Sequence, residues 1–184
     1  MLAQCAADFH GRKERYERFI NYFEKVNPDL IIIPGDLGYV NASIFEKIDI
    51  PVYAVYGNMN GDLRHLEEKI NFIDGREVSY KGINFAGFGR EILNLKEKID
   101  VLISHVPPYK TKDRAFFGMH IGDKMLRKFM EEKKPRYILC GHVHEDAGYQ
   151  KFGETYVVNC SIGKNGVCTL IDFNKNDIRF INHI

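Results

Sequence analysis

Residues 30–36 read LIIIPGD. Four consecutive aliphatic residues are typical of a strand buried on both faces in a parallel sheet, and the Pro-Gly-Asp that follows ends the strand at a turn. The same pattern recurs where Leu2–Ala7 ends at Asp8 and where Val52–Tyr56 ends at Gly57-Asn58. In open α/β sheets, ligands bind beyond the carboxyl ends of the strands. The sequence therefore predicts an α/β protein with polar side chains gathered at one sheet edge.

Helices and further strands are expected between and after these runs. The spacing of Tyr16, Phe19, Ile20 and Phe23 predicts an amphipathic helix over Arg12–Val26. The other elements predicted before residue 147 are short helices at Ser43–Ile48 and Leu63–Ile70, a hairpin of Val78–Tyr80 and Ile83–Phe88, a strand at Val101–Ser104, a helix at Met119–Lys134 and a strand at Tyr137–Cys140. After that point, an antiparallel meander is predicted from Tyr156–Asn159, Val167–Phe173 and Ile178–Ile181.

The bulk composition describes an ordinary globular chain. Its 184 residues are most simply one domain, spanning residues 1–184, with one substantial core. The formal charge of +1 gives no bias towards polyanions, and no basic tract rich in aromatic residues indicates a nucleic-acid surface. No apolar run approaches the length of a membrane span, so no membrane partner is expected.

The four cysteines show no metal-binding spacing. Each lies in or beside a strand-like run, which favours buried structural thiols over disulfides or a zinc site. The N-terminus also lacks the charged and apolar regions of a signal peptide. We therefore expect a cytoplasmic protein.

Five short polar blocks follow one another in a fixed order. They are Asp8-Phe9-His10, Gly35-Asp36, Gly57-Asn58, His105 and Gly141-His142-Val143-His144. Taken singly, each block is more often a turn, a cap or a surface pair than a ligand. Together they supply seven oxygen and nitrogen donors, each at or just beyond a strand end. This is the composition of a two-metal hydrolytic site.

Local geometry supports the same interpretation. In an extended segment, residues two apart point to the same side, so Asp8 and His10 can reach one ion, and His142 and His144 can point into one pocket. The glycines suit tight turns where the backbone passes close to a site. Oxygen and nitrogen donors without thiolate favour Mn²⁺ first, with Fe, Zn²⁺ or Ni²⁺ as alternatives.

The series D-x-H, G-D, G-N, H and G-H-x-H resembles the calcineurin-like metallophosphoesterase superfamily from Asp8 to His144. The compact size and the stretch Ser104–Pro108 are similar to the small prokaryotic phosphoesterases related to Icc and YfcE. The resemblance implies a four-layer αββα sandwich of two mixed β-sheets flanked by helices. It places Asp8, His10, Asp36 and His144 around one ion, and Asp36, Asn58, His105 and His142 around the other, with Asp36 bridging.

The resemblance also implies a reaction. Two divalent ions and two carboxylates leave a formal charge of about +2, which attracts a phosphate anion. A metal-bound hydroxide would then attack phosphorus in line, with Asn58 as a substrate contact and catalytic residue. The expected substrate is a small or nucleotide-like phosphodiester.

One position departs from the superfamily pattern. Much of the superfamily has a histidine after Gly-Asn that is thought to protonate the leaving group, whereas this chain has Met59. A thioether cannot donate a proton, which argues for diesters or other esters with good leaving groups. His120, expected to open the helix Met119–Lys134, is the candidate substitute for catalysis and substrate binding. Arg90 is a candidate phosphate contact.

A second function remains open alongside the phosphodiesterase. The same fold serves as a protein-interaction scaffold in the retromer subunit of this superfamily, which also lacks the histidine. The presence of all seven ligands favours the enzyme. The sequence leaves the formation of a homo-oligomer open.

Overall fold

The computed structural model describes residues 1–88 and 98–182, within which the strands form two six-stranded sheets. The first sheet has the order β12-β11-β1-β2-β3-β4 and the second the order β5-β6-β7-β8-β10-β9. The first contains β1 (Leu2–Cys5), β2 (Leu30–Pro34), β3 (Val52–Val55), β4 (Asn71–Phe72), β11 (Cys168–Asp172) and β12 (Asp177–Ile181). The second contains β5 (Glu77–Tyr80), β6 (Ile83–Phe88), β7 (Val101–Ser104), β8 (Tyr137–Cys140), β9 (Gly148–Phe152) and β10 (Thr155–Asn159).

Both sheets are mixed, with parallel strands in the middle. Strands β1 to β4 run parallel, and β11 and β12 add an antiparallel edge. In the second sheet, β6, β7, β8 and β10 run parallel between the antiparallel edge strands β5 and β9. The central strands β2, β7 and β8 are buried along their whole length, as their continuous apolar sequences predict.

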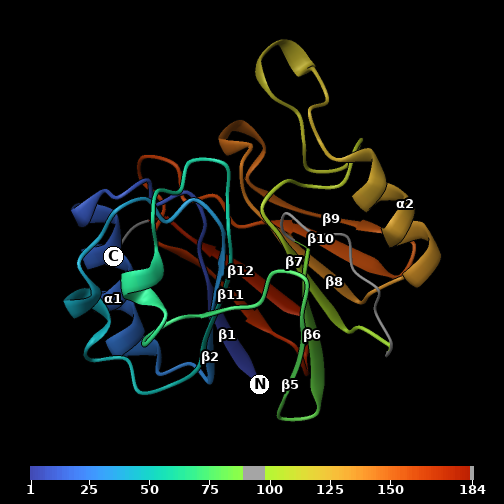
Figure 1. Cartoon of the computed structure of the whole chain (residues 1–184). Helices are drawn as coiled ribbons and strands as arrows, with labels where there is room; N and C mark the ends of the chain where they lie inside the picture. Colours follow the sequence, from blue (N-terminus) through green and yellow to red (C-terminus); the bar gives the residue numbers. More distant parts are fainter. Residues whose placement is uncertain (89–97, 183–184) are drawn as a thin grey trace.

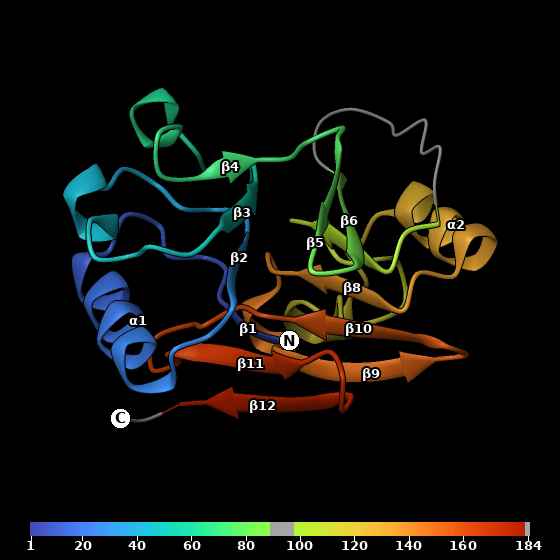
Figure 2. The ribbon, with the colours of Figure 1, turned by 90° about the horizontal axis from the view of Figure 1, so that it is seen from below.

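Four layers are stacked through three apolar clusters. Helix α1 (Lys13–Val26) buries Tyr16, Phe19 and Phe23 against the first sheet. The two sheets pack face to face through a second cluster, and α2 (Lys124–Lys133) covers the second sheet with Leu126 and Met130. Figure 2 shows the two helices on opposite sides of the molecule. The predicted αββα sandwich is confirmed.

The two sheets approach each other at one edge. An isolated parallel bridge joins Ala7, just after β1, to Ser161, just after β10. The backbone N–H of Ala7 donates to the carbonyl oxygen of Cys160 at 3.0 Å, and that of Ile162 donates to Ala7 at 3.3 Å. The carboxyl ends of parallel strands from both sheets therefore meet beside Asp8.

The second helix begins later than the sequence predicted. Helix α2 starts at Lys124, because the side chain of Asp123 caps it by accepting from the backbone N–H of Leu126 at 2.8 Å. The segment before it is held away from helical geometry, since the N–H of Gly122 donates to Asp113. His120 therefore lies in a loop and not at the start of a helix. The predicted helix at Ser43–Ile48 is a shorter 3₁₀ turn, η1 (Ala42–Phe45).

The predicted C-terminal meander is correct for its last two strands, since β11 and β12 pair antiparallel, but wrong for the first. Strand β10 lies parallel to β8 in the second sheet, whereas β11 and β12 belong to the first. The chain crosses between the sheets through residues 160–167, and sequence spacing carries no signal of that crossing. The antiparallel partner of β10 is β9, whose mostly exposed residues lack the apolar pattern of a predicted strand.

Two further observations concern the expected surroundings of the protein. All four cysteines are free and buried, as the sequence predicted. Among the described residues, no helix is long and apolar enough to cross a membrane.

Candidate metal centre

Asp8 lies at the edge where the carboxyl ends of the parallel strands of both sheets meet, and it is fully buried. Its carboxylate accepts from the hydroxyl of Ser161 and from the backbone N–H of His142, the latter at 3.0 Å. Burial raises the pKa of this carboxyl, but the interaction with His144 and the charge of His105 outweigh burial and hold the pKa below its ordinary value. Asp8 is thus an anion held in a fixed orientation.

Asp36 provides a second buried carboxylate. Its Oδ1 accepts from the backbone N–H of Met59 at 2.8 Å. Its Oδ2 lies between two rings, 3.6 Å from Nδ1 of His10 and 3.4 Å from Nε2 of His105. Burial raises the pKa of Asp36, but the hydrogen bond and charge of His105 reverse this effect, so its pKa lies below the ordinary value.

The imidazole of His105 is oriented from behind. Its Nδ1 lies 3.0 Å from the carbonyl oxygen of Pro34, so Nδ1 carries the proton and Nε2 turns its lone pair to the site. That Nε2 lies 2.8 Å from Oδ1 of Asn58 as well as near Asp36. Three electron-rich atoms therefore converge, an arrangement that a shared cation would stabilise. Burial lowers the pKa of His105, but Asp36 and Asp8 raise it above its ordinary value overall.

The Gly141–His144 segment supplies two more rings. The His142 ring centroid lies 5.0 Å from that of His105. Nε2 of His144 lies 3.2 Å from Nε2 of His10 and 3.6 Å from Oδ2 of Asp8. Asp8 raises the pKa of His144, whereas burial lowers the pKa of both His10 and His142.

The backbone brings these rings together differently from the sequence expectation. Asp8, His10 and His142 have φ values of 67°, 52° and 71°. Neither the Asp8–His10 pair nor the His142–His144 pair therefore lies on an extended segment. The donors gather because the chain turns sharply at each strand end. The expectation that they meet is correct, but the geometry behind it is wrong.

Three glycines are required by this crowding. A Cβ at Gly57 would lie 2.1 Å from Oδ1 of Asp36, and one at Gly35 would lie 2.5 Å from Nδ1 of His105. A Cβ at Gly141 would lie 2.5 Å from Cβ of Ala7 and 3.1 Å from Oδ2 of Asp8. The predicted close backbone approach at these glycines is confirmed.

The donor set fits divalent cations. Within residues 1–88 and 98–182, two groups could each hold an ion, Asp8 with His10 and His144, and Asp8 with Asp36 and His105. The Nδ1 atom of His10 is buried and has no hydrogen-bond partner among the described residues, although it points towards Asp36. A buried nitrogen lone pair facing a carboxylate is the arrangement that a bound cation completes. The role of the seven donors as metal ligands stays a prediction.

The remaining sequence candidates lie outside this group. His120 is bound through Nδ1 to Oδ1 of Asp113 at 2.6 Å, and not to any of the seven donors. The side chain of Met59 is 64% exposed beside Asp36. Arg90 lies outside the described residues, so its proposed phosphate contact stays a prediction.

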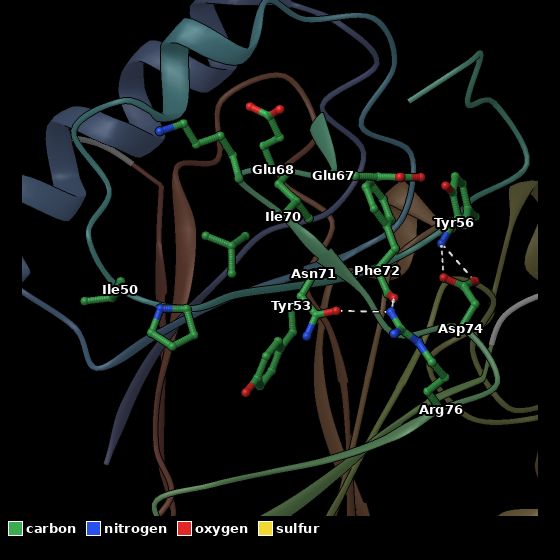
Figure 3. Close-up of a pocket in the computed structure, with 13 residues that line it drawn as sticks. Ile50, Tyr53, Tyr56, Glu67, Glu68, Ile70, Asn71, Phe72, Asp74 and Arg76 are labelled. Atoms are coloured by element: carbon green, nitrogen blue, oxygen red, sulfur yellow. Dashed lines mark hydrogen bonds between the residues drawn. The ribbon is translucent and has the colours of Figure 1, made fainter. Parts of the chain in front are cut away.

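Two hollows share the residue Tyr56. The one of about 380 Å³ adjoins the donors, because Asn58 and His105 line it together with Phe88 and Asp123. The wider one, of about 720 Å³, lies along β3 and β4 and is lined by none of the seven donors (Figure 3). Its polar groups bond to one another, since Asp74 accepts from the N–H of Tyr56 and Arg76 donates to Asn71 at 3.1 Å. Of these two hollows, the smaller one adjoins the seven donors.

Sequence reasoning missed three supporting residues. Ser161 donates to Asp8, and Asn159 fixes Ser161 by accepting from its backbone N–H at 3.1 Å. The guanidinium of Arg15, on α1, donates to the carbonyl oxygen of Asp8. Asn159 is the last residue of β10 and Ser161 lies just beyond it, so the signal of polar residues at strand ends was present. No sequence signal indicates Arg15.

Comparison with known proteins agrees with this geometry. Residues 5–146 match the family model of calcineurin-like phosphoesterases. A Methanocaldococcus jannaschii protein, called uncharacterized protein MJ1162, is 27% identical over 91% of this chain and 94% of its own length. An archaeal phosphodiesterase structure aligns over 98% of this chain and 99% of its own, with 18% identity and a TM-score of 0.70. YfcE, a phosphoesterase from E. coli, aligns over 100% of both chains with 18% identity and a TM-score of 0.51.

The two structural likenesses show the shared fold, and the family match covers the segment that carries all seven donors. The chain therefore belongs to the calcineurin-like phosphoesterase family.

Proposed function

We propose that the protein is a dinuclear metal-dependent phosphodiesterase. The observation that carries this proposal is the convergence of seven oxygen and nitrogen donors at one edge, with two buried carboxylates as anions. Membership of a phosphoesterase family supports hydrolysis of a phosphoric ester. Asp8, His10 and His144 would hold one ion, Asn58, His105 and His142 the other, and Asp36 would bridge them.

Two bound divalent cations supply a water nucleophile of lowered pKa and neutralise charge developing on the phosphate. The chain's own contribution is orientation. Ser161 and the N–H of His142 fix Asp8, the N–H of Met59 fixes Asp36, and the carbonyl of Pro34 sets the tautomer of His105. Asn58 turns its amide oxygen to His105, which leaves its amide N–H groups to donate to a phosphate oxygen.

A diester preference is part of the proposal. Met59 stands where a proton donor would assist a poor leaving group, and its thioether carries no proton to give. The hollow beside Asn58 and His105 offers room for a second substituent on the phosphate. Both features support a small or nucleotide-like phosphodiester as the substrate.

The finer assignments rest on the chemistry of the donor set. Hard oxygen and nitrogen donors without thiolate favour Mn²⁺, with Fe, Zn²⁺ or Ni²⁺ as the other candidates. Four free thiols support a cytoplasmic location for a single-domain enzyme.

The test compares hydrolysis of bis-p-nitrophenyl phosphate and p-nitrophenyl phosphate, with Mn²⁺, Ni²⁺, Zn²⁺ or no metal. We expect metal-dependent turnover that favours the diester. Asp36→Asn should lower kcat/KM by roughly 100-fold or more and reduce the bound metal, because it removes the bridging charge.

Asp177→Asn is the matched control, since Asp177 pairs with Arg179 on the remote strand β12. It should keep the activity and metal content of the wild type. If the protein hydrolysed neither substrate with any of the metals, the enzyme proposal would be rejected and the interaction scaffold favoured. A faster reaction with the monoester would overturn the diester preference.

A further inference from the structure

A loop between β7 and α2 stands clear of the body of the protein (Figure 1). We call residues 113–121 the protruding loop. Its base is built around Asp113, which is fully buried. The carboxylate of Asp113 accepts from the backbone N–H groups of Lys110, Thr111 and Gly122 at 2.9–3.0 Å, and it binds the ring of His120 at 2.6 Å. Four donors on one carboxylate fix the base of the loop.

The two sides of the protruding loop are paired above this base. The backbone N–H of Ala115 donates to the carbonyl of Met119 at 2.9 Å, and an antiparallel bridge joins Arg114 to His120. The N–H of Arg114 also donates to Asp146 at 2.9 Å, in the η4 turn (His144–Asp146). The loop is therefore held in one shape and fastened to the segment that carries His144.

The tip of the protruding loop is apolar and bare. Phe116, Phe117 and Met119 are 69%, 101% and 59% exposed. Phe117 has a φ of 60°, a left-handed conformation that phenylalanine rarely adopts. Ile121 and Met125 below the tip are also exposed. Exposure of adjacent phenylalanine side chains to water is unfavourable, and exposed apolar patches of this kind mark interaction sites.

Positive charge surrounds the base of this tip. Lys110, Arg114 and Lys124 are exposed, and no carboxylate among residues 1–88 and 98–182 forms an ion pair with them. The ammonium groups of Lys110 and Lys124 lie 5.6 Å and 5.3 Å from the ring of Tyr109. The loop thus combines an apolar tip with unpaired cations just below it, the charge pattern that complements an anionic surface.

We propose that the protruding loop docks the protein on an anionic lipid bilayer. The apolar tip enters the headgroup region, and Lys110, Arg114 and Lys124 contact the lipid phosphates. A bilayer fits better than a second copy of the chain, because the three tip side chains expose only about 400–500 Å². A stable protein interface needs about 800 Å² from each partner. A symmetric contact would also bring the same cations face to face.

The sequence expectation of no membrane partner rested on the lack of a spanning run. A surface contact needs only a few interfacial aromatic residues and basic side chains, so it leaves no such run. The inference does not depend on the proposed phosphodiesterase activity. Docking at the loop would, however, hold the His144 segment close to the bilayer through Asp146.

The experiment measures co-sedimentation of the full chain with vesicles of phosphatidylcholine, with and without about one-third phosphatidylglycerol. We expect binding to the anionic vesicles that weakens as salt is added. The double variant Phe116→Ser with Phe117→Ser should lower the partition coefficient roughly tenfold or more, which corresponds to about 1.4 kcal/mol. Arg114→Gln should weaken binding only to the anionic vesicles.

Tyr39→Ser is the matched control, since Tyr39 is 77% exposed outside the loop. It should bind as the wild type does, and circular dichroism checks that each variant is folded. Equal partition of the double variant and the wild type would overturn the proposal, as would failure of the wild type to bind anionic vesicles. A shift of the double variant from dimer to monomer in sedimentation velocity would assign the tip to a second copy instead.

Discussion

Replacing Gly57 by alanine tests whether backbone crowding sets the position of Asp36. Gly57 follows β3, and its φ lies outside the left-handed region, so alanine causes no backbone strain there. The added Cβ would lie 2.1 Å from Oδ1, 2.5 Å from the backbone nitrogen and 2.8 Å from Cγ of Asp36. Because one of these atoms belongs to the backbone, rotation of the Asp36 side chain cannot relieve the clash.

The size of the effect follows from the overlap. Ordinary contacts begin near 3.4 Å, so Oδ1 of Asp36 has to move by more than about 1 Å. A displacement of that size at a catalytic group costs roughly 100-fold in rate. Overpacking of this kind also destabilises a protein by about 1–3 kcal/mol, which lowers the Tm of a domain of this size by roughly 2–12 °C.

The matched control is Gly61→Ala, because a Cβ at Gly61 meets no atom within 4 Å. We expect Gly57→Ala to lose activity on bis-p-nitrophenyl phosphate, bound metal measured by mass spectrometry, and thermal stability. Gly61→Ala should stay within about 0.5 kcal/mol of the wild type and keep its activity. If Gly57→Ala matched Gly61→Ala in all three measurements, Asp36 would not be held by this contact and the assigned metal centre would be wrong.

Three other predictions follow from individual contacts. Ser161→Ala removes the hydroxyl that donates to buried Asp8, so it should weaken metal affinity roughly 10–100-fold in a titration, whereas unchanged affinity would show that Asp8 needs no such support. Burial raises the pKa of the Cys5 and Cys140 thiols and raises the pKa of Cys168 to about 12. Native protein should therefore resist thiol reagents, and its free energy of unfolding should fall as the pH rises from roughly 8.5 towards 12, because only the unfolded thiols lose their protons there. Rapid native labelling would contradict the burial. If His120 protonates the leaving group, His120→Ala should lower kcat on esters with poor leaving groups more than on p-nitrophenyl esters, with metal content unchanged. An equal effect on both would assign His120 to holding the loop through Asp113.

Much of the fold could be predicted from short stretches of sequence. The runs Leu30–Ile33, Val101–Ser104 and Tyr137–Cys140 are continuous and apolar, and each is a strand in the structure within one residue of its predicted bounds. These strands are buried on both faces, so burial alone selects their composition. Asp36, His105 and His142 could be predicted for the same reason, because each lies within three residues of the end of such a run.

Other features depend on contacts between distant residues. Asp123 caps α2 locally, but the non-helical course of residues 119–122 before it depends on the hydrogen bonds that Asp113 forms with Gly122 and His120, which no local pattern indicates. The assignment of β10 and β11 to different sheets is likewise decided by pairing with β8 and β1. Sequence periodicity describes which face of a strand is buried, but it carries no information on which strand lies beside it.

The protruding loop illustrates a different limit. In the sequence, Phe116, Phe117 and Met119 look like ordinary apolar residues near the start of a helix. Their exposure follows from the buried carboxylate of Asp113 and the pairing of Arg114 with His120, which together direct the loop away from the core. Apolar composition alone therefore does not show whether a residue is buried, because contacts of neighbouring residues can hold it away from the core.

The backbone of the candidate site bears on the choice between enzyme and scaffold. Asp8, His10, Asp36 and His142 all have φ between 51° and 71°, although none is a glycine. Each such residue costs roughly 1 kcal/mol or more relative to a relaxed conformation. A scaffold would gain stability from glycine at these four positions, because glycine adopts the same conformation without strain. The strain falls on four of the seven donors, where its one benefit is to position their side chains at the candidate metal centre. It therefore supports an arrangement that holds ligands.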